Sequence, residues 1–133
     1  LDNAEINNES VSALINDKNW IENDFLQIVQ QRGKAIIDAR GASSATSAAN
    51  AAIDTVKATL SETAENDWFS AAVMSDGSYN VPEGIIFGFP LRASSSGKIT
   101  IVQNLPISEY AQNKINLTTQ ELLDEKKDIS DLL

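Results

Sequence analysis

The segment from Arg40 to Ser47 is rich in small hydroxyl side chains. They fall at Ser43, Ser44, Thr46 and Ser47. A helix that begins here offers backbone amides and hydroxyl groups to an anion, because its first turn leaves N–H groups unpaired and carries partial positive charge. The alanines between the hydroxyls equally allow a second backbone to approach closely. Two interpretations therefore stay open: a tightly packed core helix, and a helix start that faces a ligand.

The chain contains neither cysteine nor histidine. Without cysteine it has no disulfide, thiol nucleophile or thiolate metal site. Without histidine it lacks the side chain best suited to proton transfer near neutral pH and the commonest metal ligand. Zinc chemistry and Ser–His or Cys–His catalysis are therefore excluded within this chain. Neither G-x-G-x-x-G nor the G-x-x-x-x-G-K-[ST] phosphate loop occurs.

Other short motifs favour structural explanations. Ser95-Ser96-Gly97-Lys98 has the S-x-x-K spacing of some serine acyl enzymes, but it falls in a predicted exposed hairpin loop. The run Asp124-Glu125-Lys126-Lys127-Asp128 mixes both signs, as a solvated helix face does. The glycosylation sequons at Asn8 and Asn116 are of a kind that often arises by chance.

The charge of the chain excludes two classes of partner. It carries 19 acidic and 10 basic residues, for a net charge of −9. This balance argues against nucleic acids and anionic membrane surfaces, both of which require a basic face. No apolar run approaches the roughly 20 residues that span a bilayer. We therefore expect a soluble cytoplasmic domain with no membrane or nucleic-acid partner and no metal.

Two long helices are predicted to position the hydroxyl segment. Apolar residues at helical spacing predict a helix over Trp20–Arg40, with Asn19 as its N-cap and Gly41 ending it. A second helix is predicted over Ala42–Leu60, capped by Ser43 or Ser44. The opening 18 residues are polar and are predicted to form a connecting segment with one helical turn.

After the helices, the pattern becomes extended. Strands are predicted over Asp67–Met74, over Ile85–Phe89 with an end near Pro90, and over Ile99–Val102. The loop Ser94–Gly97 is short, and short connections make the strands antiparallel.

A final helical stretch is predicted from Ser108. It breaks near Leu117 and restarts at Thr118 or Thr119. Its predicted apolar stripe comprises Leu122, Leu123, Ile129, Leu132 and Leu133. Residues 1–133 together predict one α+β domain, with long helices packed on a small three-stranded antiparallel sheet.

At this point the residues carry a specific resemblance that extends, in order, from about Ile15 to Leu133. The matching runs include Trp20-Ile21, Gln30-Gln31-Arg32-Gly33, Ala39-Arg40-Gly41, Ser43-Ser44-Ala45, Ser47-Ala48-Ala49, Ala52-Ile53-Asp54, Ser75-Asp76-Gly77-Ser78-Tyr79, Val81-Pro82-Glu83-Gly84, Phe89-Pro90, Leu105-Pro106-Ile107 and Leu117-Thr118. Together they resemble the C-terminal domain of cytosolic-type malate dehydrogenases, within the lactate/malate dehydrogenase family.

The resemblance implies a half-enzyme. In that family an N-terminal Rossmann domain binds NAD, a His–Asp pair moves the proton, and arginines bind the dicarboxylate, all upstream of the matched region. We therefore expect this chain to interconvert malate and oxaloacetate only as part of a longer protein, to be inactive and free of NAD alone, and to form a homodimer.

The same resemblance assigns the serines. Ser43 or Ser44 corresponds to the wall facing the substrate, and Ser47 faces the nicotinamide side. Arg32 and Arg40 do not correspond to the substrate arginines and are interpreted as structural. The alternatives are a domain of a lactate dehydrogenase and a stand-alone binding or scaffold module that kept the fold without the chemistry.

Overall fold

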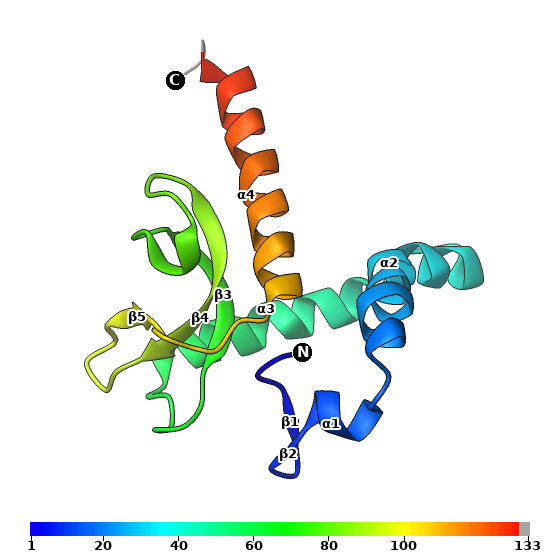
Figure 1. Cartoon of the computed structure of the whole chain (residues 1–133), viewed down its shortest axis with the longest axis horizontal. Helices are drawn as coiled ribbons and strands as arrows, with labels where there is room; N and C mark the ends of the chain where they lie inside the picture. Colours follow the sequence, from blue (N-terminus) through cyan, green and yellow to red (C-terminus); the bar gives the residue numbers. More distant parts are fainter. Residues whose placement is uncertain (131–133) are drawn as a thin grey trace. The chain divides into compact units, whose positions relative to one another are not determined.

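The computed structural model describes residues 1–130 (Figure 1). The chain divides into two compact units, Leu1–Ile53 and Asp54–Leu133, and each is described by itself. Within the described residues, no helix is long and apolar enough to cross a membrane.

The first unit opens with a small hairpin. Strands β1 (Glu5–Ile6) and β2 (Glu9–Ser10) pair antiparallel, and helix α1 (Val11–Ile15) follows. Asn7 and Asn8 both have positive φ, at 52° and 65°, as the two central residues of a type I′ turn require. The sequence predicted the helical turn but not the hairpin.

The long helix of this unit starts earlier than predicted. A π-helical segment η1 (Trp20–Phe25) leads directly into α2 (Leu26–Arg40). Asn19 is already helical, and the Oδ1 of Asp17 instead accepts a 2.9 Å hydrogen bond from the Trp20 amide. The N-cap prediction was therefore wrong by two residues. The i, i+5 spacing of a π-helix brings the Trp20 and Phe25 rings to 5.5 Å.

Helix α3 (Ala45–Leu60) follows α2 after a short connection, and the unit boundary falls inside it. It begins three residues later than predicted, since residues 42–44 are not helical.

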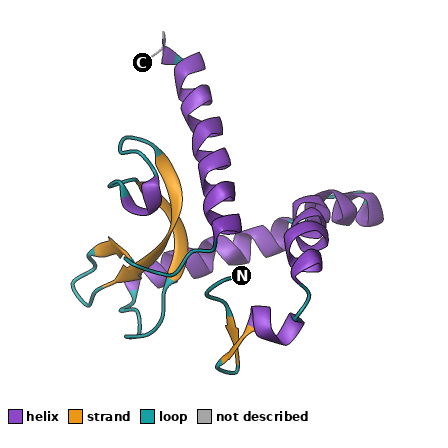
Figure 2. Cartoon of the chain, viewed as in Figure 1, coloured by secondary structure: helices purple, strands orange, loops and turns teal. Residues whose placement is uncertain are grey.

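The second unit contains the predicted sheet. Strands β3 (Phe69–Met74), β4 (Ile86–Ala93) and β5 (Ile99–Ile101) are antiparallel in the order β3-β4-β5 (Figure 2). Val73 lies opposite Phe87, and Leu91 lies opposite Ile101.

The sequence predicted an end at Pro90 or shortly after it, and β4 continues through Pro90 to Ala93. Pro90 pairs with Ser70, and its carbonyl accepts a 2.8 Å hydrogen bond from the Val102 amide. The nitrogen and carbonyl of a strand residue point to the same side, so the Pro90 nitrogen faces away from β3. The Pro90 nitrogen lies just beyond the end of the β4–β5 pairing, whose last pair is Leu91 and Ile101. No strand residue there requires a hydrogen bond from an N–H of Pro90.

A single helix, α4 (Glu109–Asp128), closes the chain. Ser108 caps it as predicted, accepting a hydrogen bond from the Ala111 amide. The predicted break near Leu117 is absent. Of the predicted stripe, Leu122 and Leu123 pack against the core and Ile129 is 47% exposed, while Leu132 and Leu133 lie outside the described residues.

One face of the sheet carries the core. Its buried residues are Val81, Ile85, Phe89 and Leu91, with Ile115, Leu122 and Leu123 of α4 packed against them. Alternation along β3 and β4 turns Phe69, Ala71 and Val73 to this face. The fold class is therefore confirmed: α+β, with long helices and a three-stranded antiparallel sheet.

Candidate functional site

The predicted site lies between two helix ends. Gly41 ends α2 in the left-handed conformation, with φ of 70°, and its amide donates a 2.7 Å hydrogen bond to the Ile37 carbonyl. Residues with side chains disfavour this conformation, so glycine suits the turn from α2 towards α3. The turn places Ser43 and Ser44 immediately before the first residue of α3, with Ser47 in its first turn.

The backbone of Ser44 organises the start of α3. Its carbonyl accepts hydrogen bonds from the Ser47 amide at 3.0 Å and the Ser47 hydroxyl at 2.9 Å. Ser44 is half-buried, whereas Ser43 and Ser47 are exposed. The structure thus brings all three predicted residues into one segment. The Ser47 hydroxyl donates to the backbone and keeps its lone pairs for a ligand.

This segment can orient a ligand but cannot move its protons. Residues 41–53 contain no titratable side chain. Arg32 and Arg40 are exposed, and neither guanidinium group forms a hydrogen bond or ion pair within residues 1–130. The prediction that both are structural therefore gains no support from a contact. No group of three acidic residues in this range is placed to hold a metal ion.

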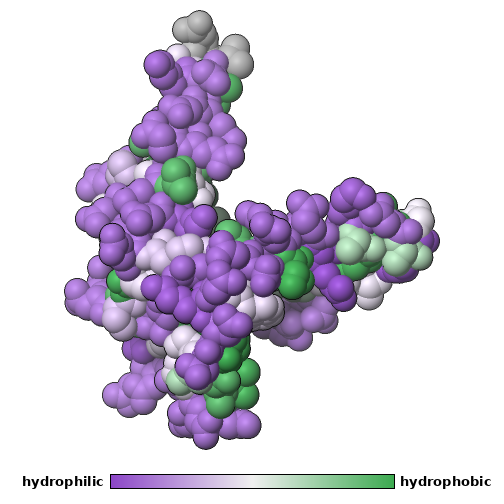
Figure 3. Space-filling model, turned by 45° about the vertical axis from the view of Figure 1, so that its right-hand side comes forward, coloured by the Kyte–Doolittle hydropathy of each residue, from purple (hydrophilic) through white to green (hydrophobic). Residues whose placement is uncertain are grey.

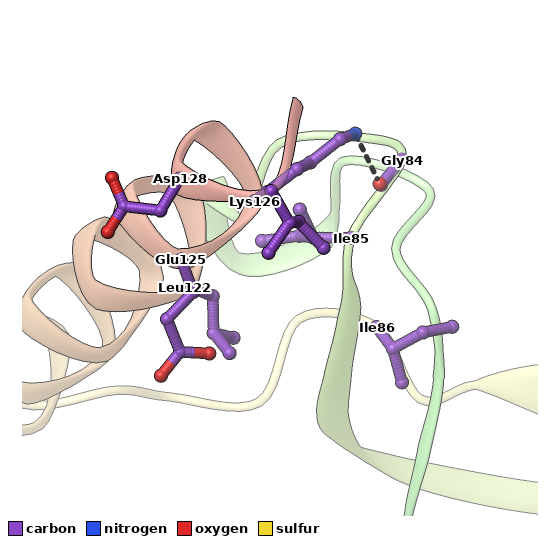
Figure 4. Close-up of a pocket in the computed structure, with 8 residues that line it drawn as sticks. Gly84, Ile85, Ile86, Leu122, Glu125, Lys126 and Asp128 are labelled. Atoms are coloured by element: carbon purple, nitrogen blue, oxygen red, sulfur yellow. Dashed lines mark hydrogen bonds between the residues drawn. The ribbon is translucent and has the colours of Figure 1, made fainter. Parts of the chain in front are cut away.

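A hollow of considerable size lies elsewhere, in the second unit. It encloses about 610 Å³ between the start of β4 and the end of α4 (Figure 4). Ile85, Ile86 and Leu122 form its apolar lining, and the Lys126 ammonium donates a 2.9 Å hydrogen bond to the Gly84 carbonyl. Sequence reasoning missed this hollow, because Gly84 and Lys126 lie 42 residues apart along the chain.

Two smaller spaces lie along the sheet. One, of about 100 Å³, lies between β4 and Ile115 of α4 and is lined by Tyr79, Phe89 and Leu105. The other, of about 390 Å³, is lined by residues such as Val73, Leu91 and Ile101. None of these three spaces is lined by Ser43, Ser44 or Ser47. Ser43 and Ser47 are exposed and Ser44 is half-buried.

Helices α2 and α3 present large apolar side chains to solvent. Ile28 and Val29 are 56% and 54% exposed, and Ile37 and Ile53 are 48% and 53% exposed. Apolar areas interrupt the polar surface in the space-filling view (Figure 3).

Comparison with known proteins gives consistent results. The model of the lactate/malate dehydrogenase alpha/beta C-terminal domain family matches residues 2–133. Malate dehydrogenase from Naegleria fowleri is 43% identical with a TM-score of 0.80, over 90% of this chain and 36% of that one. Lactate dehydrogenase from Trichomonas vaginalis, solved with NADH and oxamate, is 28% identical with a TM-score of 0.77, over 86% of this chain and 35% of that one.

A third structure resembles the chain in fold alone. Malate dehydrogenase from Salinibacter ruber has a TM-score of 0.69 at 21% identity, over 96% of this chain and 41% of that one. The chain therefore spans about a third of the length of the solved dehydrogenases that it matches. Since the family match covers nearly all of its residues, the chain belongs to the lactate/malate dehydrogenase family, as its alpha/beta C-terminal domain.

Proposed function

We propose that this domain is the substrate-side part of an NAD-dependent malate dehydrogenase. One observation carries the choice of substrate: identity to the Naegleria malate dehydrogenase is 43%, whereas identity to the Trichomonas lactate dehydrogenase is 28%. The reaction transfers a hydride between malate and NAD, and its proton-transfer residues would lie outside this chain.

The proposed contribution of the chain is to orient the reactants. Ser43 or Ser44 would contact the substrate from the start of α3, and Ser47 would face the nicotinamide side. The exposure of Ser43 and Ser47, and the position of all three beside the α3 N-terminus, support these roles. Hydroxyls at such a position hydrogen-bond a carboxylate or an amide and favour negative charge.

The residues of this chain could contact only the nicotinamide side of NAD. Binding a dinucleotide usually requires a glycine-rich loop at a helix start for the pyrophosphate, and the chain has no such loop. Ser47 can supply one hydroxyl to the nicotinamide side. When bound, the cofactor accepts or donates the hydride. The rest of its binding site would come from a separate nucleotide-binding domain.

The same proposal assigns a use to the exposed apolar side chains of α2 and α3. Ile28, Val29 and Ile37 would be covered by a second copy of the protein, forming a homodimer. Sedimentation of the full-length protein tests this part. We expect a dimer that Ile28→Asp shifts towards monomer, with exposed Asn113→Asp on α4 as the control. A full-length monomer would contradict it.

Two experiments test the assignment itself. The coding sequence upstream of Leu1 should contain a glycine-rich dinucleotide loop and a histidine, and the isolated chain should oxidise malate only at background rate. A reading frame that starts near Leu1 would favour the stand-alone module, and turnover by the isolated chain would contradict our placement of the proton-transfer residues.

The serine roles need a separate measurement in the full-length protein. Losing one hydrogen bond is worth about 1 kcal/mol, or roughly a fivefold change in affinity. We expect Ser43→Ala or Ser44→Ala to raise KM for malate by about that factor. Ser47→Ala should raise KM for NAD instead, and exposed Ser61→Ala should change neither. Unchanged KM values in all three variants would remove these residues from the site.

A lactate dehydrogenase is the second candidate. The specific observation in its favour is the TM-score of 0.77 to the Trichomonas lactate dehydrogenase, nearly that to the Naegleria malate dehydrogenase. The fold alone does not separate the two substrates, so the assays compare malate with lactate directly.

A further inference from the structure

The hairpin of β4 and β5 lies in a stretch of this acidic chain that has only basic charged residues. Residues 84–108 contain no aspartate or glutamate, and their charged residues are Arg92 and Lys98. No other stretch of the chain runs as long without an acidic residue. This stretch of sequence thus carries a charge of +2 in a chain of net charge −9; Ala93 and Arg92 hydrogen-bond to Thr63 and Asp67 of the segment before β3. The two cations flank the loop Ser94–Gly97, which joins β4 to β5 (Figure 1).

The three serines of this loop differ in their hydrogen bonds. The Ser94 hydroxyl accepts a 3.1 Å hydrogen bond from the Lys98 amide and shares a 2.9 Å hydrogen bond with the Ser96 hydroxyl. The Ser95 hydroxyl forms no hydrogen bond with any of residues 1–130. All three serines are exposed. Ser95 is therefore the serine whose hydroxyl can be modified without breaking a hydrogen bond of the loop.

The surroundings allow an enzyme to reach Ser95. Strand β5 has three residues and lies at the edge of the sheet, so β4 is its only neighbouring strand. The loop is closed by hydrogen bonds from Ser94 N–H to the Lys98 carbonyl and from Gly97 N–H to the Ser94 carbonyl. Such short edge elements open locally at low free-energy cost, which presents the segment in extended form.

We propose that Ser95 is a phosphorylation site for a serine kinase that recognises basic residues near its target. Arg92 precedes Ser95 by three positions and Lys98 follows it by three, and an acidic substrate groove would bind both. In the reaction the Ser95 hydroxyl oxygen attacks the γ-phosphorus of Mg·ATP and forms the new O–P bond. The bond to the β,γ-bridging oxygen breaks, ADP leaves, and the hydroxyl proton passes to the catalytic carboxylate of the kinase.

The product is compatible with the fold. A phosphoserine carries a charge of about −2 and three acceptor oxygens. Lys98 is exposed and its ammonium forms no hydrogen bond or ion pair within residues 1–130, so the ammonium is available to pair with the phosphate. Arg92 uses Nε to donate to the Asp67 carbonyl and keeps its terminal nitrogens. The modification would turn a local charge of +2 to about zero.

A second serine supplies an internal comparison. Ser43 is also exposed and also follows an arginine, Arg40, by three positions. Its surroundings differ, because Asp38 lies two residues before that arginine and no cation follows within ten residues. If exposure and one arginine were sufficient, both serines would be modified equally. The cations on both sides of Ser95 instead favour modification at Ser95.

The experiment uses the intact chain, Mg·ATP and a cation-directed serine kinase of the cyclic-nucleotide-dependent class, with an acid-directed kinase alongside. Sites are mapped by peptide mass spectrometry. We expect one phosphoryl group, on Ser95, added by the cation-directed kinase. Ser95→Ala should lower the initial rate at least tenfold, and Lys98→Ala should lower it severalfold.

Matched variants separate the specific site from general exposure. Ser96→Ala changes the neighbouring hydroxyl and should leave the rate within twofold, and Lys98→Arg should keep the wild-type rate. Circular dichroism checks that each variant is folded. Modification mainly at Ser43, Ser94 or Ser96, preference for the acid-directed kinase, or no phosphorylation by either kinase would each overturn the proposal.

Discussion

The buried hydroxyl of Ser75 donates a 2.7 Å hydrogen bond to the carbonyl oxygen of Val81, across the loop between β3 and β4. Ser75 also accepts from the Gly77 amide at 3.2 Å, and its own amide donates to the Ile85 carbonyl at 2.9 Å. Val81 is fully buried, so without this hydroxyl its carbonyl would lose its partner away from water. One side chain thus fixes the loop that joins two core strands.

Ser75→Ala should therefore lower the free energy of unfolding by about 1–3 kcal/mol, the cost of a buried unpaired polar group. Ser70→Ala is the matched control, because Ser70 lies exposed on the adjacent strand β3, and it should change stability by less than about 0.5 kcal/mol. Urea unfolding measures both. Equal effects would show that the Ser75 hydrogen bond does not stabilise the loop.

Thr119, unlike Ser75, has a buried hydroxyl without a hydrogen-bond partner among the described residues. Its side chain is 7% exposed, and its hydroxyl finds no hydrogen-bond partner within residues 1–130. Thr119→Val keeps the shape and removes the unpaired hydroxyl, so it should raise the free energy of unfolding by about 1 kcal/mol. The exposed neighbour Thr118→Val should change little. Destabilisation by Thr119→Val would mean that the hydroxyl has a partner, such as a bound water.

Gly33 and Gly41 should respond to the same substitution with opposite signs. Gly33 lies inside α2 with no atom within 4 Å of an added Cβ, so Gly33→Ala should stabilise by about 0.5–1 kcal/mol. Gly41 has φ of +70°, so Gly41→Ala is strained and should destabilise by roughly 1 kcal/mol. Thermal unfolding of the two variants compares them. Stabilisation by Gly41→Ala would contradict the left-handed helix end that places the serines.

Asp76 should make stability depend on pH in the acid range. Hydrogen bonds from the Ser78 hydroxyl, and then from the Ser78 amide, hold the pKa of Asp76 below its ordinary value of 3.8. The unfolded chain lacks these bonds. Their stabilisation is thus fully present above the unfolded pKa and is lost as the pH falls through the folded pKa.

Comparison with Asp76→Asn measures this contribution. The difference in urea midpoint between wild type and Asp76→Asn should be constant at neutral pH and shrink as the pH falls below about 4. Asp24→Asn, an exposed carboxylate with no hydrogen bond or ion pair within residues 1–130, serves as the control for a general charge effect. A difference that grows with acidity would contradict the lowered pKa.

Much of the fold follows from local signals in the sequence. The apolar residues Trp68, Phe69 and Val73 located β3, glycine located the end of α2, and Ser108 located the start of α4. Each signal acts within a few residues, through side-chain direction, backbone conformation or capping. The Asn7-Asn8 turn was missed although its signal was local, because the strands beside it have two residues each and show no alternation.

The errors arose where distant contacts override local preference. Thr118 or Thr119, with Glu121 following, suggested a new helix start after a break near Leu117, but Thr119 is buried and α4 continues through it. Pro90 suggested a strand end, but its missing N–H falls where β4 needs no donor. At the site, the three serines are close in space because they lie within five residues of one another in the sequence. None of the three spaces described above lies beside them.

The central claim is most directly tested by the substrate preference of the full-length protein. Initial rates of NAD reduction with malate and with lactate give kcat/KM for each. We expect at least a hundredfold preference for malate, since a site built to pair a second carboxylate rejects a substrate that lacks it. Preference for lactate, or turnover of neither substrate, would contradict it.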